Sequence, residues 1–167
     1  MSKLNEYRRI IGYSYLLYIA FIIPISLLHE FGHVAICSAD GYQFDMWLDL
    51  TGGHSLCYGT PGDNLVMGAM GGIFGLLASL GILAFWHYFC KKAVPIAAVA
   101  LALMLDQGIK ILLEGFLPGL YSAGRFDLLI TILQIISVAV FAIYFTRKLR
   151  REDDSSRYLT RESKLGI

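Results

Sequence analysis

Four long apolar stretches constrain this chain more than any other feature of its sequence. They cover roughly residues 10–39, 65–89, 93–117 and 126–145, and each is long enough to cross a bilayer, which takes a helix of about 20 residues. Only helices and closed barrels satisfy every backbone polar group in lipid, and the stretches lack the two-residue alternation of barrel strands. The sequence therefore predicts an all-α integral membrane protein with four transmembrane helices.

The composition agrees with a membrane protein. Hydrophobic residues make up 56% of the 167 residues and charged residues only 16%, where about 25% charged is usual for soluble domains. The charges gather at the ends, because residues 1–9 hold four and residues 145–167 hold eleven. This pattern excludes a disordered chain and a nucleic-acid-binding domain. It predicts a four-helix transmembrane domain over residues 1–146 and a charged cytoplasmic tail over residues 147–167.

The basic residues also predict an orientation, since Lys and Arg mark the cytoplasmic side of a membrane protein. Twelve of the fourteen lie before residue 10, at residues 91–92 or after residue 146. The segment 40–64 holds four Asp and no Lys or Arg. We therefore expect a multi-pass protein with both termini in the cytoplasm and segment 40–64 on the outer side.

The segment between the first two spans carries a weaker signal. Residues 42–50 alternate, with Phe44, Met46 and Leu48 on one face, and Gly52-Gly53 follows before residues 55–58. This pattern predicts a short β-hairpin, and the alternative is an amphipathic loop lying on the membrane surface. The three cysteines, Cys37, Cys57 and Cys90, have no metal-type spacing. We expect isolated thiols, although a Cys37–Cys57 disulfide is open because both fall on the outer side.

The first span ends in the sequence His29-Glu30-Phe31-Gly32-His33, an H-E-x-x-H motif. A spacing of four residues puts the two histidines on one face of a helix, where they can bind one Zn²⁺ ion. Glu30 is then the candidate general base acting on a zinc-bound water. Charged and imidazole side chains are costly within a membrane span and are usually functional. The alternative is a pair of interfacial histidines bonded to loop backbone.

A catalytic zinc site usually has three protein ligands, so an acid must join the histidines. Asp106 and Glu114 share one helical stripe with Lys110, which gives both acids a structural explanation as ion-pair partners. At 1.5 Å per residue, His29 lies about 28 Å above residue 10, whereas Asp106 lies only about 20 Å above residue 93. Asp127 begins the fourth span at the outer level, near the height of His29. We therefore predict Asp127 as the third ligand, ahead of Asp106.

Glycines cluster at the start of the second span. Gly68 and Gly72, and likewise Gly71 and Gly75, form small-xxx-small pairs, which let helices approach closely. We expect these glycines to pack against the first span at the level of the histidines.

With the H-E-x-G-H form in an apolar helix and this glycine-rich stretch, the chain resembles the site-2 protease family of intramembrane zinc metalloproteases. The resemblance implies one zinc ion per chain, an aspartate as third ligand, and cleavage of a membrane-embedded protein or peptide substrate. Asp127 matches that aspartate by position, although Leu128 follows it where the family commonly has Gly.

The sequence therefore predicts an intramembrane zinc metalloprotease that hydrolyses peptide bonds in or near membrane-spanning segments. Its partners are a membrane-embedded substrate and the lipid bilayer, with no nucleic acid. Two alternatives are a membrane transporter of metal ions or protons and an inactive relative that only binds membrane segments. A transporter needs polar groups along its whole path, whereas the first two spans are polar only near one end.

Overall fold

The structure is a computed structural model that describes residues 3–49, 52–59, 64–122 and 124–165. It consists of helices α1 (Lys3–Ala39), α2 (Asn64–Phe89), α3 (Val94–Phe116), α4 (Pro118–Ser122) and α5 (Asp127–Leu165), with strands β1 (Phe44–Asp49) and β2 (Gly52–Cys57) after α1. In these ranges four helices, α1, α2, α3 and α5, are long and apolar enough to cross a membrane. The predicted helical architecture, with a hairpin between the first two spans, is confirmed.

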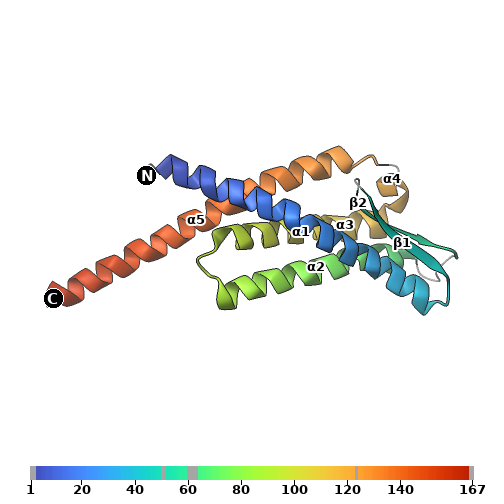
Figure 1. Cartoon of the computed structure of the whole chain (residues 1–167), viewed down its shortest axis with the longest axis horizontal. Helices are drawn as coiled ribbons and strands as arrows, with labels where there is room; N and C mark the ends of the chain where they lie inside the picture. The colour runs from blue at the N-terminus through green and yellow to red at the C-terminus, as the bar shows by residue number, and fades with distance from the viewer. Residues whose placement is uncertain (1–2, 50–51, 60–63, 123, 166–167) are drawn as a thin grey trace.

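The two ends of the molecule are built differently (Figure 1). The N-terminus, the turn between α2 and α3 and the C-terminus lie toward one end, and the strands and α4 lie toward the other. Helix α5 continues without interruption from its apolar part into the charged tail. The basic residues before residue 10, at 91–92 and after 146 thus belong to one end of the structure.

Helix α3 is the centre of the bundle, because it contacts α1, α2 and α5. Its first half is lined by buried small residues, which include Ala97, Ala98, Ala100 and Ala102. Leu103 and Val99 of α3 pack with Tyr18 and Ile25 of α1 and Val138 of α5 in the main apolar cluster. Small side chains on α3 let three long helices surround it closely.

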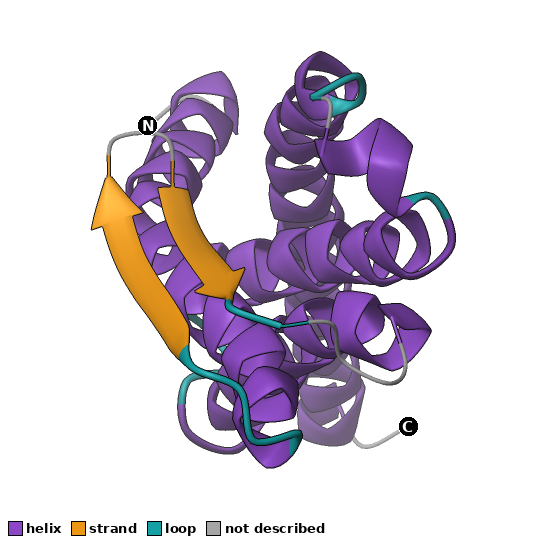
Figure 2. Ribbon diagram, turned by 90° about the vertical axis from the view of Figure 1, so that its right-hand side faces the viewer, coloured by secondary structure: helices purple, strands orange, loops and turns teal. Residues whose placement is uncertain are grey.

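The hairpin is antiparallel, with Phe44 opposite Cys57 and Asp49 opposite Gly52. It lies along one side of the bundle beside α1 (Figure 2). Gly52 and Gly53 belong to β2, so these glycines pair within the hairpin and do not form its turn. Residues 50–51 lie outside the described residues. Phe44, Met46 and Leu48 are exposed, as are the other residues of β1, so their alternation marks a strand but does not separate a buried face from an exposed one.

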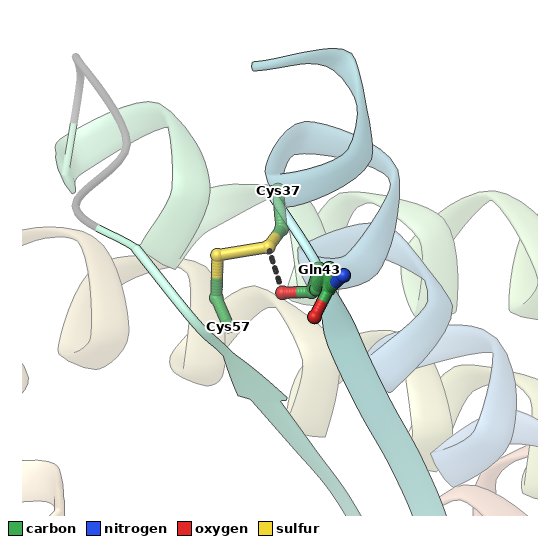
Figure 3. The surroundings of a disulfide bond; sticks show 3 residues. All are labelled: Cys37, Gln43 and Cys57. Atoms are coloured by element: carbon green, nitrogen blue, oxygen red, sulfur yellow. Dashed lines mark hydrogen bonds between the residues drawn. A yellow bond between two sulfur atoms is a disulfide. The ribbon is translucent and has the colours of Figure 1, made fainter. Parts of the chain in front are cut away.

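A disulfide joins Cys37 at the end of α1 to Cys57 at the end of β2 (Figure 3). The expectation of three isolated thiols is therefore wrong for this pair, while Cys90 is free. The physical reason is the hairpin register, which returns Cys57 beside Phe44 and so to the end of α1. The Cys37 sulfur also lies 3.5 Å from the Gln43 carbonyl oxygen. The cross-link ties the second strand to the helix that carries the H-E-x-x-H motif.

The α2 glycines remove side chains where three helices meet. A methyl group at Gly71 would overlap the imidazoles of His29 and His33 on α1, as the expected packing on the first span requires. The other three glycines of the two small-xxx-small pairs face α3 instead: Gly68 meets the backbone of Glu114, and Gly72 and Gly75 meet Gln107. The expectation is thus correct for Gly71 and wrong for the rest. Glycines spread over about two turns bring α2 against both α1 and α3.

Candidate metal centre

The motif histidines face each other on one side of α1. Their Nε2 atoms are 3.2 Å apart. The Nδ1 atom of His33 lies 2.7 Å from the carbonyl oxygen of Met67, and the Nδ1 atom of His29 lies 2.9 Å from Oε1 of Gln107. Both partners are oxygens that can only accept hydrogen bonds, so each Nδ1 carries the proton. In the neutral rings the Nε2 lone pairs therefore point toward each other.

Glu114 of α3 completes this group. Its Oε2 atom lies 3.1 Å from Nε2 of His29 and 3.3 Å from Nε2 of His33. His29 and Glu114 are both buried. Burial of a carboxylate is costly unless its charge is compensated, and Glu114 thus needs either a proton on the histidines or a cation.

The spacing of these three atoms suits a metal ion. Bonds of about 2.0 Å in a tetrahedral zinc site put neighbouring donors about 3.3 Å apart. The three separations of 3.1, 3.2 and 3.3 Å agree with that edge length. Two imidazole nitrogens and one carboxylate oxygen are also ligands that zinc accepts in catalytic sites. The residues therefore fit a zinc ion with one coordination position left open.

Gly71 of α2 leaves space beside the Nε2 atoms of the two imidazoles. A Cβ atom added there would overlap Nε2 of His33 and come within 2.9 Å of Nε2 of His29. The absence of a side chain at this position keeps the lone-pair side of the histidines clear.

Glu30 lies next to the histidines and is held by the hairpin. The ligand atoms of His29, Glu30 and His33 all lie within 4.8 Å of one another. The Ser55 hydroxyl of β2 donates a 2.6 Å hydrogen bond to Oε2 of Glu30. Two residues earlier on β2, the backbone N–H of Gly53 donates to the Ser26 hydroxyl of α1 at 2.9 Å. The hairpin thus fixes the orientation of Glu30 toward the histidine pair.

These residues open into a cleft of about 830 Å³ between α1, β2, α2, α3 and the start of α4. Its walls include all five residues described above, His29, Glu30, His33, Ser55 and Glu114. A second cleft of about 520 Å³ shares Ser26, Gly52, Lys110 and Tyr121 with the first. The candidate metal centre is therefore accessible and has room for a ligand much larger than water.

Tyr121 of α4 forms part of the wall shared by the two clefts. Burial, and next the nearby carboxylate of Glu114, raise the pKa of its hydroxyl. The hydroxyl therefore stays protonated at neutral pH and keeps its hydrogen-bond donor.

The other predicted acids are placed differently. Asp127 is the first residue of α5, but its side chain lies outside the described residues, so its role as third ligand stays a prediction. Asp106 accepts hydrogen bonds from Gln107 and Gln134 and pairs with Lys110 at 3.3 Å. Among the described residues, Glu114 is the acid that meets both histidines.

The rise along a helix could have identified Glu114. It lies about 30 Å above residue 94 at 1.5 Å per residue, close to the height of His29. The sequence also offers Lys110 as an ion-pair partner for Glu114, but in the structure Lys110 pairs with Asp106. No sequence pattern predicts the contact of Gln107 with His29, since a single amide in an apolar helix can have many different partners.

Comparison of the chain with protein-family models, with curated proteins and with solved structures finds no match.

We predict that Gly71→Ala weakens zinc binding by more than the roughly 10–100-fold loss that follows changes in residues that hold a metal ligand in place. The new methyl group would occupy the space beside both Nε2 atoms. Gly81→Ala is the matched control, since it makes the same change on α2 in open space. Zinc affinity measured by competition with a chromophoric chelator compares the two. Equal affinity in both variants would place the metal elsewhere.

Proposed function

We propose that this protein is an intramembrane zinc metalloprotease that hydrolyses peptide bonds in or near membrane-spanning segments, as its resemblance to the site-2 protease family implies. The observation that carries the proposal is the meeting of two imidazole nitrogens and a buried carboxylate oxygen beside Glu30, within an open cleft.

In this proposal one zinc ion per chain is held by His29, His33 and Glu114. The proposal moves the third ligand from Asp127 to Glu114, because Glu114 has the required contacts. A zinc ion bound there would polarise the scissile carbonyl group and lower the pKa of a water ligand to about 7.

Glu30 is the general base in this proposal. Its carboxylate accepts a proton from the attacking water and delivers it to the leaving amine. The Ser55 hydroxyl holds Oε2, which leaves Oε1 for the proton transfer. Holding a base at a fixed distance from the reacting atoms lowers the entropy cost of the step.

The surface of the helices supports a membrane location. Large apolar side chains are exposed along all four long helices; examples are Leu16, Ile19, Leu77, Phe85, Leu112, Ile135 and Ile136. Such extensive apolar surface is unusual on a soluble protein and suits lipid. The Cys37–Cys57 disulfide favours an oxidising compartment for the hairpin. Together with the basic residues at the opposite end, it supports cytoplasmic termini.

The second cleft supports a membrane-embedded protein or peptide as substrate. Apolar residues of α1 and α5, among them Ile22, Ile23 and Ile130, line it together with polar groups such as Thr131 and Gln134. A peptide segment that unwinds at membrane depth needs partners for its backbone as well as apolar surroundings. The shared wall residues connect this cleft with the candidate metal centre.

The alternatives are less well supported. The bundle half near the termini is filled by apolar clusters, one around Leu103 and Val138 and another around Ala97 and Phe145. Among the described residues these apolar clusters interrupt the polar groups of the site, whereas a transporter needs polar groups along its whole path. A relative that only binds membrane segments needs neither a general base nor metal ligands. This chain has Glu30 beside His29 and His33.

We predict that Glu30→Gln abolishes peptide cleavage, by at least about 10²–10⁴-fold, while zinc stays bound, because the amide cannot accept the proton of water. Glu6→Gln is the matched control on the same helix, since Glu6 pairs with Arg150 far from the site. Cleavage of a membrane-segment peptide and metal content are measured on the same detergent samples. Normal cleavage by Glu30→Gln would refute the protease mechanism.

We predict that Glu114→Ala loses stoichiometric zinc, because it removes one of three ligands. Asp127→Ala is expected to retain zinc, and metal content per folded chain decides between the two acids. Zinc loss in Asp127→Ala with normal zinc in Glu114→Ala would restore Asp127 as the ligand.

We predict that thiol reagents reach native Cys90, in the turn after α2, only from the cytoplasmic side of the membrane. A cysteine introduced by Met46→Cys on exposed β1 should react only from the opposite side. The physical reason is the basic residues near the termini and Lys91, which favour the cytoplasm. Labelling in right-side-out and inverted vesicles tests both positions, and the reverse pattern would invert the proposed orientation.

A further inference from the structure

A buried hydrogen-bonded chain leads away from His29 on the side opposite the candidate metal position. The Nδ1 atom of His29 meets Oε1 of Gln107 at 2.9 Å. The Nε2 atom of Gln107 donates a 2.9 Å hydrogen bond to Oδ2 of Asp106. Gln107 is 1% exposed and Asp106 is 4% exposed, so both side chains are held mainly by protein partners.

Asp106 is itself held from two directions. Gln134 of α5 donates a 2.6 Å hydrogen bond to its Oδ1 atom, and the Lys110 ammonium group lies 3.3 Å from its Oδ2 atom. A buried carboxylate that meets an ammonium group and an amide donor is held in place by both. Asp106 therefore presents a fixed acceptor to Gln107.

This acceptor settles which way the Gln107 amide points. Because the two oxygens of Asp106 meet the Gln134 amide and the Lys110 ammonium group as acceptors, the NH₂ group of Gln107 faces Asp106, and its oxygen faces His29. The imidazole of His29 then carries its proton on Nδ1, and its Nε2 lone pair faces His33 and Glu114. His33 reaches the same state by a different route, through the Met67 carbonyl oxygen.

Gly75 leaves the space that the Gln107 side chain occupies. A Cβ atom at Gly75 would overlap the amide oxygen of Gln107. The chain thus depends on a residue of α2 that touches neither histidine.

We propose that Gln107 and Asp106 are positioning residues that fix the tautomer and ring orientation of His29, so that its Nε2 lone pair is available to a metal ion. Outer partners of this kind typically change metal affinity 10–100-fold. This inference rests on the proposed metal centre for its consequence, but the tautomer itself can be measured in metal-free protein.

The first test is ¹⁵N NMR of histidine-labelled, metal-free protein in detergent, at a pH at which imidazole is neutral. The His29 signals are assigned by their loss in His29→Gln. The wild type should show the Nδ1–H tautomer at His29. Gln107→Leu, which keeps the volume but removes the acceptor, should shift His29 toward the other tautomer and leave His33 unchanged.

The second test is zinc affinity, together with the visible absorption of bound Co²⁺. Gln107→Leu should bind zinc 10–100-fold more weakly and alter the Co²⁺ spectrum. Gly75→Ala, which displaces the amide without removing it, should act in the same direction, and Gly81→Ala should not. Circular dichroism and gel filtration confirm that each variant is folded.

An unchanged His29 tautomer and unchanged zinc affinity in folded Gln107→Leu would overturn the proposal. If that variant does not fold, the same result in Gly75→Ala would overturn it. A tautomer change in Gln107→Leu with no zinc binding in the wild type would support the positioning role while refuting the metal centre. The two proposals can therefore fail separately.

Discussion

The close approach of α2 to α1 and α3 is the constraint on which the site depends. Gly71 faces the two imidazoles, Gly68 faces the backbone of Glu114, and Gly75 faces Gln107. Even a methyl group at any of these positions would push the helices apart. A metal site tolerates only small displacements of its ligands, so three atoms from two helices meet only because a third helix contributes no side chains there.

Much of this architecture follows from the sequence, because the relevant patterns are local. Apolar length predicts the four long helices, and the four-residue spacing predicts that His29 and His33 share a face. The third acid is a non-local question. Its answer depends on which of two acids Lys110 pairs with, and the stripe formed by Asp106, Lys110 and Glu114 allows either choice. Gln134 of α5 donates a hydrogen bond to Asp106, the acid with which Lys110 pairs. The sequence of α3 alone does not reveal this contact.

Two other features were beyond sequence analysis for a similar reason. The disulfide required the hairpin register, which was ambiguous because the segment also suits a loop on the membrane surface. The role of Gln107 required both the orientation of Asp106 and the position of Gly75, on another helix. In each case the residue type is common, and only its partners in space give it a specific use.

The charges at the site require positive charge beside the two histidines. Asp106 and Lys110 neutralise each other, and His54 is associated with Asp49. Of the charged residues that line the main cleft, Glu30 and Glu114 remain, each with one negative charge, beside imidazoles whose Nδ1 atoms are both engaged. Two negative charges beside buried imidazoles are unfavourable unless they are compensated. A proton on each histidine, or one divalent ion between the two Nε2 atoms and Glu114, would cancel both.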